Sequence, residues 1–228
     1  MDFNFNDDQK AIRDLANQIF GDRSSDEFLL GFDRNDEVYD DQLWSTLAEQ
    51  GLLGITVPEA AGGIGLGLVE LCLVLEEQGR RVAPVPLYSS LVLGGLPIAE
   101  FGSEEQQQRL LGALASGEAR FSAAIADLGM TAPLATEVTA TAKADGWVVS
   151  GHKAMVPDGK TANYILVPAT YADGLQSFFI VDTGVAGATV TPVEVGISGQ
   201  RAAHLDLDNA PAELLGNVGQ GADILEWL

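Results

Sequence analysis

The side chains that most often carry out chemistry are scarce in this sequence. Its 228 residues include one cysteine, Cys72, and two histidines, His152 and His204, which lie far apart along the chain. One cysteine excludes a disulfide framework and a zinc site built from thiolates. Cys72 lies in an apolar run, where cysteines usually pack and do not react. We expect His152 in an exposed turn after Gly151 and His204 packed in a strand, so no metal centre is predicted.

Two glycine-containing stretches resemble functional loops at first sight. Residues Gly62–Gly67 have the sequence Gly-Gly-Ile-Gly-Leu-Gly. A dinucleotide-binding loop needs the spacing G-x-G-x-x-G directly after a buried parallel strand. The spacing differs here and the loop joins two helical segments, so we predict a tight entry into a helix. The run Gly196–Gly199 lacks the G-x-S-x-G pattern, and no neighbouring histidine supports a serine nucleophile.

The charge of the chain excludes several classes of protein. It has 33 acidic residues against 12 lysines and arginines, a formal net charge of −21. Nucleic-acid binders and proteins that dock on anionic membranes need clustered positive charge, so neither partner is expected. No apolar run reaches the roughly 20 residues that span a bilayer. The acidic start at Met1-Asp2-Phe3 lacks the basic region of a signal peptide, and we expect a cytoplasmic protein.

The elements that position these residues change in character near residue 120. Up to residue 118 the apolar residues recur at helical spacing. Asn6 and Gln9 form a capping box for the first helix, which we expect to end at Gly21. An extended segment is expected at Gly54–Pro58. The predicted helices are Asp8–Phe20, Asp40–Gln50, Leu66–Gln78, Ser89–Phe101 and Ser103–Ala115. The third is apolar on nearly every side, so we expect it to be covered all round.

After Phe121 the apolar residues alternate with a period of two. Seven short segments rich in Thr, Val, Ile and aromatic residues are separated mainly by Gly, Asp or Pro, which is typical of an antiparallel barrel or sandwich. The predicted strands are Phe121–Ala126, Glu137–Ala144, Gly146–Val149, Tyr164–Ala169, Gln176–Val181, Ala188–Val195 and Ala202–Leu207.

The chain therefore has the pattern of an α+β protein. We expect an N-terminal α-helical domain over residues 1–119 and a middle β-domain over 120–216. Residues 217–228 have the pattern of the start of a further amphipathic helix. We therefore expect the chain to be a piece of a longer gene product, truncated before a C-terminal helical bundle.

Several long stretches resemble the acyl-CoA dehydrogenase family. Residues 43–80 contain V-P-E followed by G-G-x-G and a helix ending in E-E-x-G-R, like the N-terminal helical domain of that family. Residues 101–119 are similar to the last helix of that domain. Residues 146–169, with a G-x-K turn, and residues 178–216 are similar to the middle β-domain. These similarities occur in the same order as in the family, which makes the resemblance more specific than any single motif.

The resemblance implies a three-part fold and a reaction. Members bind FAD and dehydrogenate an acyl-CoA thioester between its α and β carbons. A glutamate base removes the α proton, the flavin accepts the β hydride, and hydrogen-bond donors stabilise the developing enolate. The electrons pass to an electron-accepting flavoprotein. In most members the base lies in the C-terminal helical domain, so no catalytic residue is assigned in this chain.

The sequence departs from the family where the flavin is expected to bind. By position, the cofactor-binding residues would be Ile125, Ala126, Met155 and Pro157. The family's T-E-P-x-A-G-S-D-like segment is replaced from Ile125 onward, with Ala126 at the threonine position. Met155 stands in place of a Trp or Phe that would pack against the flavin ring. Pro157 stands in place of a Thr or Ser and has neither a hydroxyl nor a backbone N–H to donate.

These departures leave more than one hypothesis open. The first is an FAD-dependent acyl-CoA dehydrogenase, or a subunit of one, working as a homo- or hetero-oligomer. The alternative is a degenerate, flavin-poor subunit or scaffold of a heteromeric acyl-CoA dehydrogenase, such as some bacterial members that act on steroid-CoA side chains. The A-P-V-P sequence at Ala83–Pro86 is similar to that bacterial subgroup. A third hypothesis is a module that binds CoA thioesters without redox chemistry.

Overall fold

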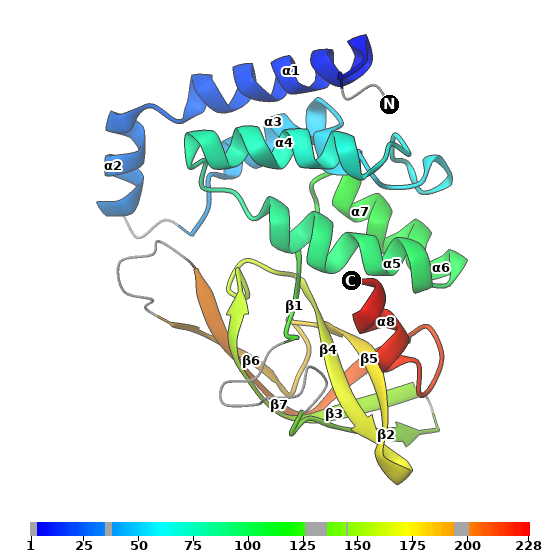
Figure 1. The fold of residues 1–228 in the computed structure, drawn as a ribbon. Helices are drawn as coiled ribbons and strands as arrows, with labels where there is room; N and C mark the ends of the chain where they lie inside the picture. Colours follow the sequence, from blue (N-terminus) through cyan, green and yellow to red (C-terminus); the bar gives the residue numbers. More distant parts are fainter. Residues whose placement is uncertain (1–3, 35–37, 126–135, 145, 194–200) are drawn as a thin grey trace.

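The computed structural model describes residues 4–34, 38–125, 136–144, 146–193 and 201–228. Figure 1 shows a layer of helices from the first half of the chain above a β-barrel from the second half. The last helix returns to the helical layer, so that the C-terminus lies beside it. This α+β arrangement confirms the expected fold class. Within the described residues, no helix combines the length and the apolar character that crossing a membrane would require.

The first three helices follow the sequence pattern with one addition. Helix α1 spans Asp7–Arg23 and has the predicted capping box, in which the Asn6 side chain accepts from the Gln9 N–H at 2.8 Å. It continues past Gly21, because glycine weakens a helix without ending it when the following turn packs well. Helix α2, Asp26–Arg34, was not predicted. Helix α3, Asp41–Glu49, is capped by Asp40.

The segment expected to be extended at Gly54–Pro58 is instead a series of turns. Two 3₁₀ helices, η1 (Leu52–Gly54) and η2 (Glu59–Ala61), lie at its two ends. The glycine-rich loop then leads into helix α4, Leu68–Arg81, as the sequence predicts. A Cβ atom at Gly63 would collide with the carbonyl oxygen of Val57, so the loop can fold back only with glycine at this position.

The apolar pattern of helix α4 calls for cover on every side, but the described residues leave one face of it exposed. Leu68 is 62% exposed, Val69 is 49% exposed, and Cys72 is exposed on the same helix. The apolar pattern is therefore correct, but one face of the helix has no cover within the described residues. Cys72 belongs to this face and not to the core.

Two long helical stretches complete this half of the molecule and contain π-helical segments. The first combines η3 (Tyr88–Gly95) with α5 (Leu96–Phe101). The second combines α6 (Glu104–Gln106), η4 (Gln107–Leu111) and α7 (Gly112–Ala115). Both stretches match the predicted helices. π-Helical turns are uncommon and often lie at functional sites.

Among the described residues, five of the seven strands form a closed ring, and the other two pair at its sides. The strands are β1 (Phe121–Ala123), β2 (Thr139–Lys143), β3 (Gly146–Pro157), β4 (Tyr164–Tyr171), β5 (Leu175–Asp182), β6 (Ala188–Val193) and β7 (Ala202–Leu215). The ring runs β4–β2–β3–β7–β5 and closes on β4, while β1 pairs with β4 and β6 pairs with β7. A short helix, η5 (Ala172–Gly174), joins β4 to β5.

Three features of the barrel differ from the prediction. Strand β4 pairs in parallel with β1 and β2, whereas the other pairings are antiparallel. Parallel neighbours need a long connection, and residues 124–163 supply one between β1 and β4. Strand β3 continues through the expected turn, because Gly151 adopts φ +145° at an irregularity in its pairing with β7. Strand β7 extends to Leu215, well beyond Leu207.

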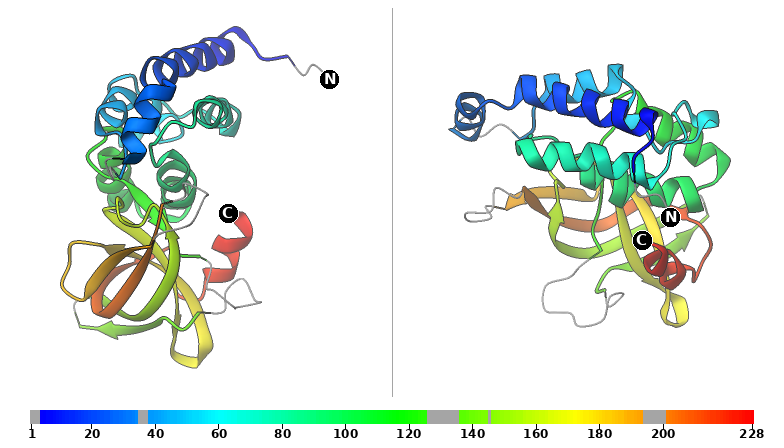
Figure 2. Two further views of the ribbon diagram at one scale, coloured as in Figure 1. Left: turned by 90° about the vertical axis from the view of Figure 1, so that its left-hand side faces the viewer. Right: turned by 45° about the horizontal axis from the view of Figure 1, so that its top comes forward.

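The helical layer and the barrel share part of one core. Phe178, Ile180 and Leu215 from the barrel are buried together with residues of the helical layer. Helix α8 (Gly221–Trp227) adds Ile224 to this core. Figure 2 shows α8 beside the helical layer, where Trp227 packs edge-on against Phe101 with ring centroids 5.5 Å apart. A second core fills the barrel itself.

Candidate functional site

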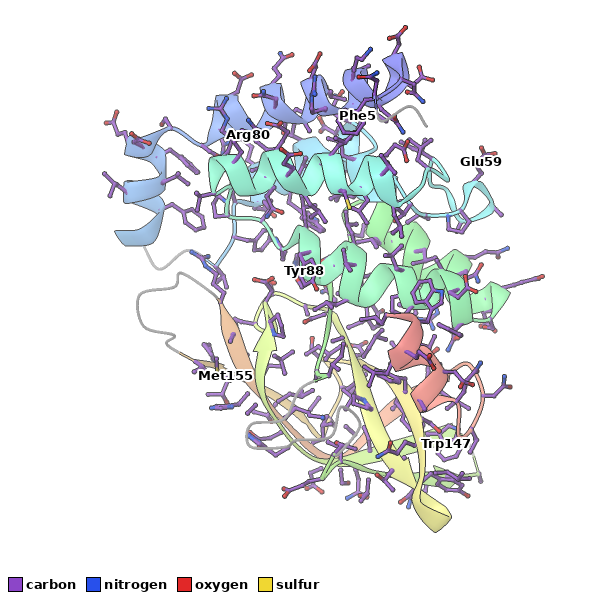
Figure 3. All side chains as sticks on the ribbon, viewed as in Figure 1. Phe5, Glu59, Arg80, Tyr88, Trp147 and Met155 are labelled. Carbon is purple, nitrogen blue, oxygen red and sulfur yellow. The ribbon has the colours of Figure 1, made fainter. Side chains whose placement is uncertain are left out.

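A cavity of about 650 Å³ lies where the helical layer meets the barrel. The helical side of its wall comes from α2, the end of α4 and the segment from Val82 to Tyr88. The barrel side comes from the end of β3 and the start of β7. Figure 3 shows Tyr88 on the helical side and Met155 on the barrel side of this region.

The end of strand β3 forms the barrel wall of the cavity through an irregular backbone. The pairing of β3 with β7 shifts register between Lys153 and Val156, and Met155 in this bulge has φ +56°. A positive φ is unusual for a side chain of this size and re-aims it relative to a regular strand. Met155 is half-buried, and Pro157 is exposed at the cavity. The backbone irregularity therefore presents both side chains to the same space.

The helical wall is held in place by hydrogen bonds to its main chain. The Gln78 amide nitrogen donates to the carbonyl oxygens of Ala83 at 3.2 Å and Val85 at 2.6 Å. The Asp40 N–H donates to the Pro84 carbonyl oxygen at 2.9 Å. Two prolines in this segment have fixed φ angles. The Ala83–Pro86 segment is therefore a rigid wall of the cavity.

Asp158 connects the two walls. Its Oδ2 accepts a hydrogen bond from the Ser89 hydroxyl at 2.6 Å, and its N–H donates to the Arg201 carbonyl oxygen at 2.6 Å. Burial raises the pKa of the Asp158 carboxyl above its usual value, while the Ser89 hydroxyl and the Arg201 charge lower it. Asp158 also has a positive φ of 47°. The site thus contains a half-buried carboxyl in a strained loop.

Two aromatic side chains, Phe32 and Tyr39, and one arginine, Arg201, line the remaining side of the cavity. The Arg201 guanidinium lies 4.7 Å from the Phe32 ring centroid, and Arg120 lies 4.6 Å from that of Tyr39. These separations are typical of cation–π contacts. The Tyr39 hydroxyl donates to Asp41 at 2.9 Å. Burial and this hydrogen bond raise the pKa of Tyr39, and the charge on Arg120 opposes the increase.

The structure brings together two of the four predicted cofactor-binding residues. Met155 and Pro157 both line the cavity. Ile125 follows β1, is half-buried and packs against the core of the helical layer, so it does not line this cavity. Ala126 lies outside the described residues.

Sequence reasoning missed several other residues of this site. Asp158 directly follows Pro157, and its position beside a predicted site residue was the available signal. Arg201 comes from a distant segment, and neither spacing nor composition pointed to it. Phe32 belongs to α2, the helix that was not predicted. The Ala83–Pro86 sequence was noted as a family resemblance and proves to form part of the wall.

The two histidines lie together on the barrel, away from this cavity. His152 is on β3, where its Nδ1 lies 2.7 Å from Asp206 Oδ1, and its ring centroid is 5.2 Å from that of His204. His152 is exposed as predicted, but in a strand and not in a turn. His204 is half-buried in β7 as expected. No set of three or more His, Cys, Asp or Glu side chains in the described ranges is placed to hold a metal ion.

Comparison with known proteins gives a consistent result over nearly the whole chain. Residues 6–118 match the family model for the acyl-CoA dehydrogenase N-terminal domain, and residues 123–210 match that for the middle domain. Acyl-CoA dehydrogenase FadE27 of Mycobacterium tuberculosis is 30% identical over 230 aligned residues, which cover 100% of this chain and 59% of that protein. The chain thus spans somewhat over half the length of this relative.

Solved structures add information on assembly and cofactor. A variant of the steroid ACAD Tcur3481–Tcur3483 is 40% identical with a TM-score of 0.86, covering 96% of this chain and 60% of that one. The ChsE4–ChsE5 complex from Mycobacterium tuberculosis is 29% identical with a TM-score of 0.88, covering 100% and 60%. An acyl-CoA dehydrogenase from Bacillus anthracis, complexed with FAD, is 30% identical with a TM-score of 0.85, covering 97% and 39%.

Proposed function

Because this chain belongs to the acyl-CoA dehydrogenase family, of which it spans the N-terminal and middle domains, we propose that it serves in a heteromeric acyl-CoA dehydrogenase as the flavin-poor subunit. The assembly would dehydrogenate an acyl-CoA thioester and pass the electrons to an electron-accepting flavoprotein. The flavin that takes part would be held by the partner subunit. Met155 and Pro157, side by side at the cavity, are the observation that carries this proposal.

The described residues of the cavity do not fit a flavin ring. Met155 offers an apolar thioether and no aromatic face for stacking. Pro157 offers no hydroxyl and no N–H, and its carbonyl oxygen already accepts a hydrogen bond from Ser122. The next side chain is the Asp158 carboxyl, which is bound to Ser89. A flavin ring has polar edges that need partners when buried, and an unmet buried polar group costs about 1–3 kcal/mol. We therefore assign no redox step to this chain.

Two relatives support the heteromeric part of the proposal. One is described as the Tcur3481–Tcur3483 steroid ACAD and another as the ChsE4–ChsE5 complex. Both descriptions name two components. The exposed apolar face of α4, with Leu68, Val69 and Cys72, is also suited to contact with a further helical surface.

A self-sufficient flavoenzyme is the second candidate function. The relative from Bacillus anthracis, solved with FAD, is 30% identical to this chain and favours it. In that case main-chain donors would have to replace the side chains that are missing at Met155 and Pro157.

The visible absorption spectrum of the complete gene product distinguishes the two candidate functions. It is measured for the protein purified alone and for the protein co-expressed with its homologous partner. We expect no flavin absorption from the protein alone and a flavin band from the pair. A flavin band in the protein alone would contradict the proposal and support the self-sufficient enzyme. Absence of flavin from both preparations would contradict a redox function of the assembly.

A further inference from the structure

The two histidines are far apart in the sequence, but the barrel brings them together on its outer face. His152 on β3 pairs directly with Asp206 on β7, and His204 precedes Asp206 by two residues. Residues two apart in a strand point to the same side of the sheet. The alternate residues of β7, Leu205 and Leu207, are buried in the core of the barrel. The three polar side chains therefore share the outside of the barrel, where His152 is 49% exposed.

Asp206 holds the His152 ring in the form that can bind a metal ion. Its Oδ1 lies 2.7 Å from His152 Nδ1. An ionised carboxylate accepts hydrogen bonds and cannot donate, so in the neutral ring the proton is on Nδ1 and the lone pair is on Nε2. The same order of carboxylate, imidazole and metal orients histidine ligands in metalloproteins. Asp206 is therefore a positioning residue at this site and not a ligand.

His204 contributes a ring nitrogen that has no partner of its own. Its Nδ1 is buried and accepts or donates no hydrogen bond among the described residues. Leaving such a nitrogen unmet is unfavourable, and most buried polar groups in native proteins have a partner. A neutral imidazole can bind a metal ion through either of its nitrogens. A metal ion bound at His204 Nδ1 would therefore remove this penalty.

The separation of the two rings fits a single ion held between them. The centroids of the His152 and His204 rings lie 5.2 Å apart. A zinc ion binds an imidazole nitrogen at about 2.0–2.1 Å, which places the ion about 3.2 Å from the ring centroid. Two rings at the tetrahedral angle of about 109° on one zinc ion then have centroids about 5 Å apart. The observed spacing therefore requires no movement of either strand.

We propose that His152 and His204 together bind one Zn²⁺ ion on the outside of the barrel. With two protein ligands the site is open, and water would complete the tetrahedral shell. Imidazole suits borderline ions such as Zn²⁺, whereas Mg²⁺ and Ca²⁺ prefer oxygen ligands. The formal net charge of −21 also attracts cations to the surface of the protein. The bound ion would link β3 to β7 across the sheet.

The test measures Zn²⁺ binding to the complete gene product, purified without a histidine tag and freed of metal with a chelator. Isothermal titration calorimetry gives the number of sites and the dissociation constant. His152→Gln and His204→Gln each remove one of two linked ligands, so each should weaken Zn²⁺ binding by about a hundredfold or more. Mg²⁺ should show no comparable binding to the wild type, because its preferred ligands are oxygens.

Two exposed aspartates of β7 provide a matched pair of variants. Asp206→Asn removes the carboxylate that positions His152 and should weaken Zn²⁺ binding by about 10–100-fold. Asp208→Asn removes an equal charge from the same strand, but the Asp208 carboxylate accepts from Asn209 and not from a histidine. In physiological salt, which screens exposed charges, Asp208→Asn should change the dissociation constant by less than about threefold.

Thermal melting gives a second reading of the same site. Zn²⁺ at about a hundred times its dissociation constant should raise the melting temperature of the wild type by several degrees. The double variant His152→Gln/His204→Gln should show no such increase. Melting of each variant without zinc verifies that it is folded.

Two outcomes would overturn the inference. The first is Zn²⁺ binding by the wild type that is no tighter than binding by the double variant. The second is an equal effect of Asp206→Asn and Asp208→Asn, which would leave only a general attraction of cations to the acidic surface. The site lies away from the cavity, so its failure would be distinguishable from a failure of the proposed function, which the flavin spectra decide.

Discussion

The Ser89 hydroxyl and the Asp158 carboxyl form a 2.6 Å hydrogen bond that joins a π-helical segment to the loop after strand β3. The neighbouring Ser90 makes a reciprocal pair of bonds with the backbone N–H and carbonyl of Phe121, at 3.1 and 3.2 Å. Two consecutive buried serines thus attach the helical layer to strand β1 and to the loop after β3. The cavity wall and the contact between the layers depend on the same short segment.

Removing the Ser89 hydroxyl should destabilise the protein. Ser89→Ala leaves the half-buried Asp158 carboxyl without its donor, and we expect a loss of about 1–3 kcal/mol in the free energy of unfolding. Ser116→Ala is the control, because that exposed hydroxyl bonds only locally to Ala113 and its loss should cost less than about 0.5 kcal/mol. Urea denaturation measures both. Equal losses would contradict the connecting role of Ser89.

Asp158 should make stability depend on pH in a defined direction. Its pKa is raised by burial, so between the unfolded and folded values the folded state binds more protons than the unfolded state. The burial penalty is present above the folded pKa and is lost as the pH falls below it. The stability of the wild type should therefore rise relative to Asp158→Asn when the pH is lowered from neutral toward the ordinary Asp pKa of about 4. Parallel stability curves for the two proteins over this range would contradict the prediction.

Gly94 should tolerate no side chain, because of its contact with β1. A Cβ atom at Gly94 would collide with the Phe121 side chain, and overpacking of a core costs about 1–3 kcal/mol. Gly79→Ala, within α4, is the matched control. An added Cβ at Gly79 has no heavy atom within 4 Å, so alanine should stabilise the helix by up to about 1 kcal/mol. Melting curves of the two variants should therefore shift in opposite directions.

The ion pair between Arg23 and Asp40 should matter more than the exposed pairs. Asp40 is only 4% exposed, and its carboxylate accepts from Arg23 at 2.8 Å and from the Leu43 N–H at 3.0 Å. Arg23→Met should cost about 2 kcal/mol, less than for a fully buried pair because Arg23 itself is 30% exposed. Arg13→Met, which removes the exposed pair with Asp14, should cost less than about 1 kcal/mol. Chemical denaturation would show whether the two losses differ.

The sequence was sufficient to predict elements whose patterns are local. The capping box of Asn6 and Gln9 and the glycine-rich loop before α4 are confirmed by the structure. Features that depend on residues distant in the sequence could not be predicted from local patterns. Gly151 was interpreted as a turn, because glycine is common in turns, but the pairing of β3 with β7 carries the strand through it at a positive φ. The exposure of Cys72 depends on which surface covers α4. The sequence of the helix alone does not show which of its faces is covered.

The candidate site could be predicted only in part, for the same reason. Met155 and Pro157 were identified from a family position, and the cavity contains both. Arg201 lies beyond a segment with no recognisable motif, and it reaches the cavity only through the pairing of β7 with the end of β3. Phe32 lies on a short helix that the apolar pattern did not reveal. The fold brings such residues together across the sequence, and a scan of spacings cannot detect them.

The shared core also determines when the helical layer can finish folding during synthesis on the ribosome. Strand β1 pairs with β4, and the core of the helical layer includes Leu215 and Ile224. The first half of the chain therefore cannot finish folding when it emerges, because these core residues are synthesised only with the last barrel strand and the helix that follows it. Contacts so distant in sequence form slowly. During this delay the nascent helical layer would expose apolar surface to chaperones and to neighbouring subunits alike.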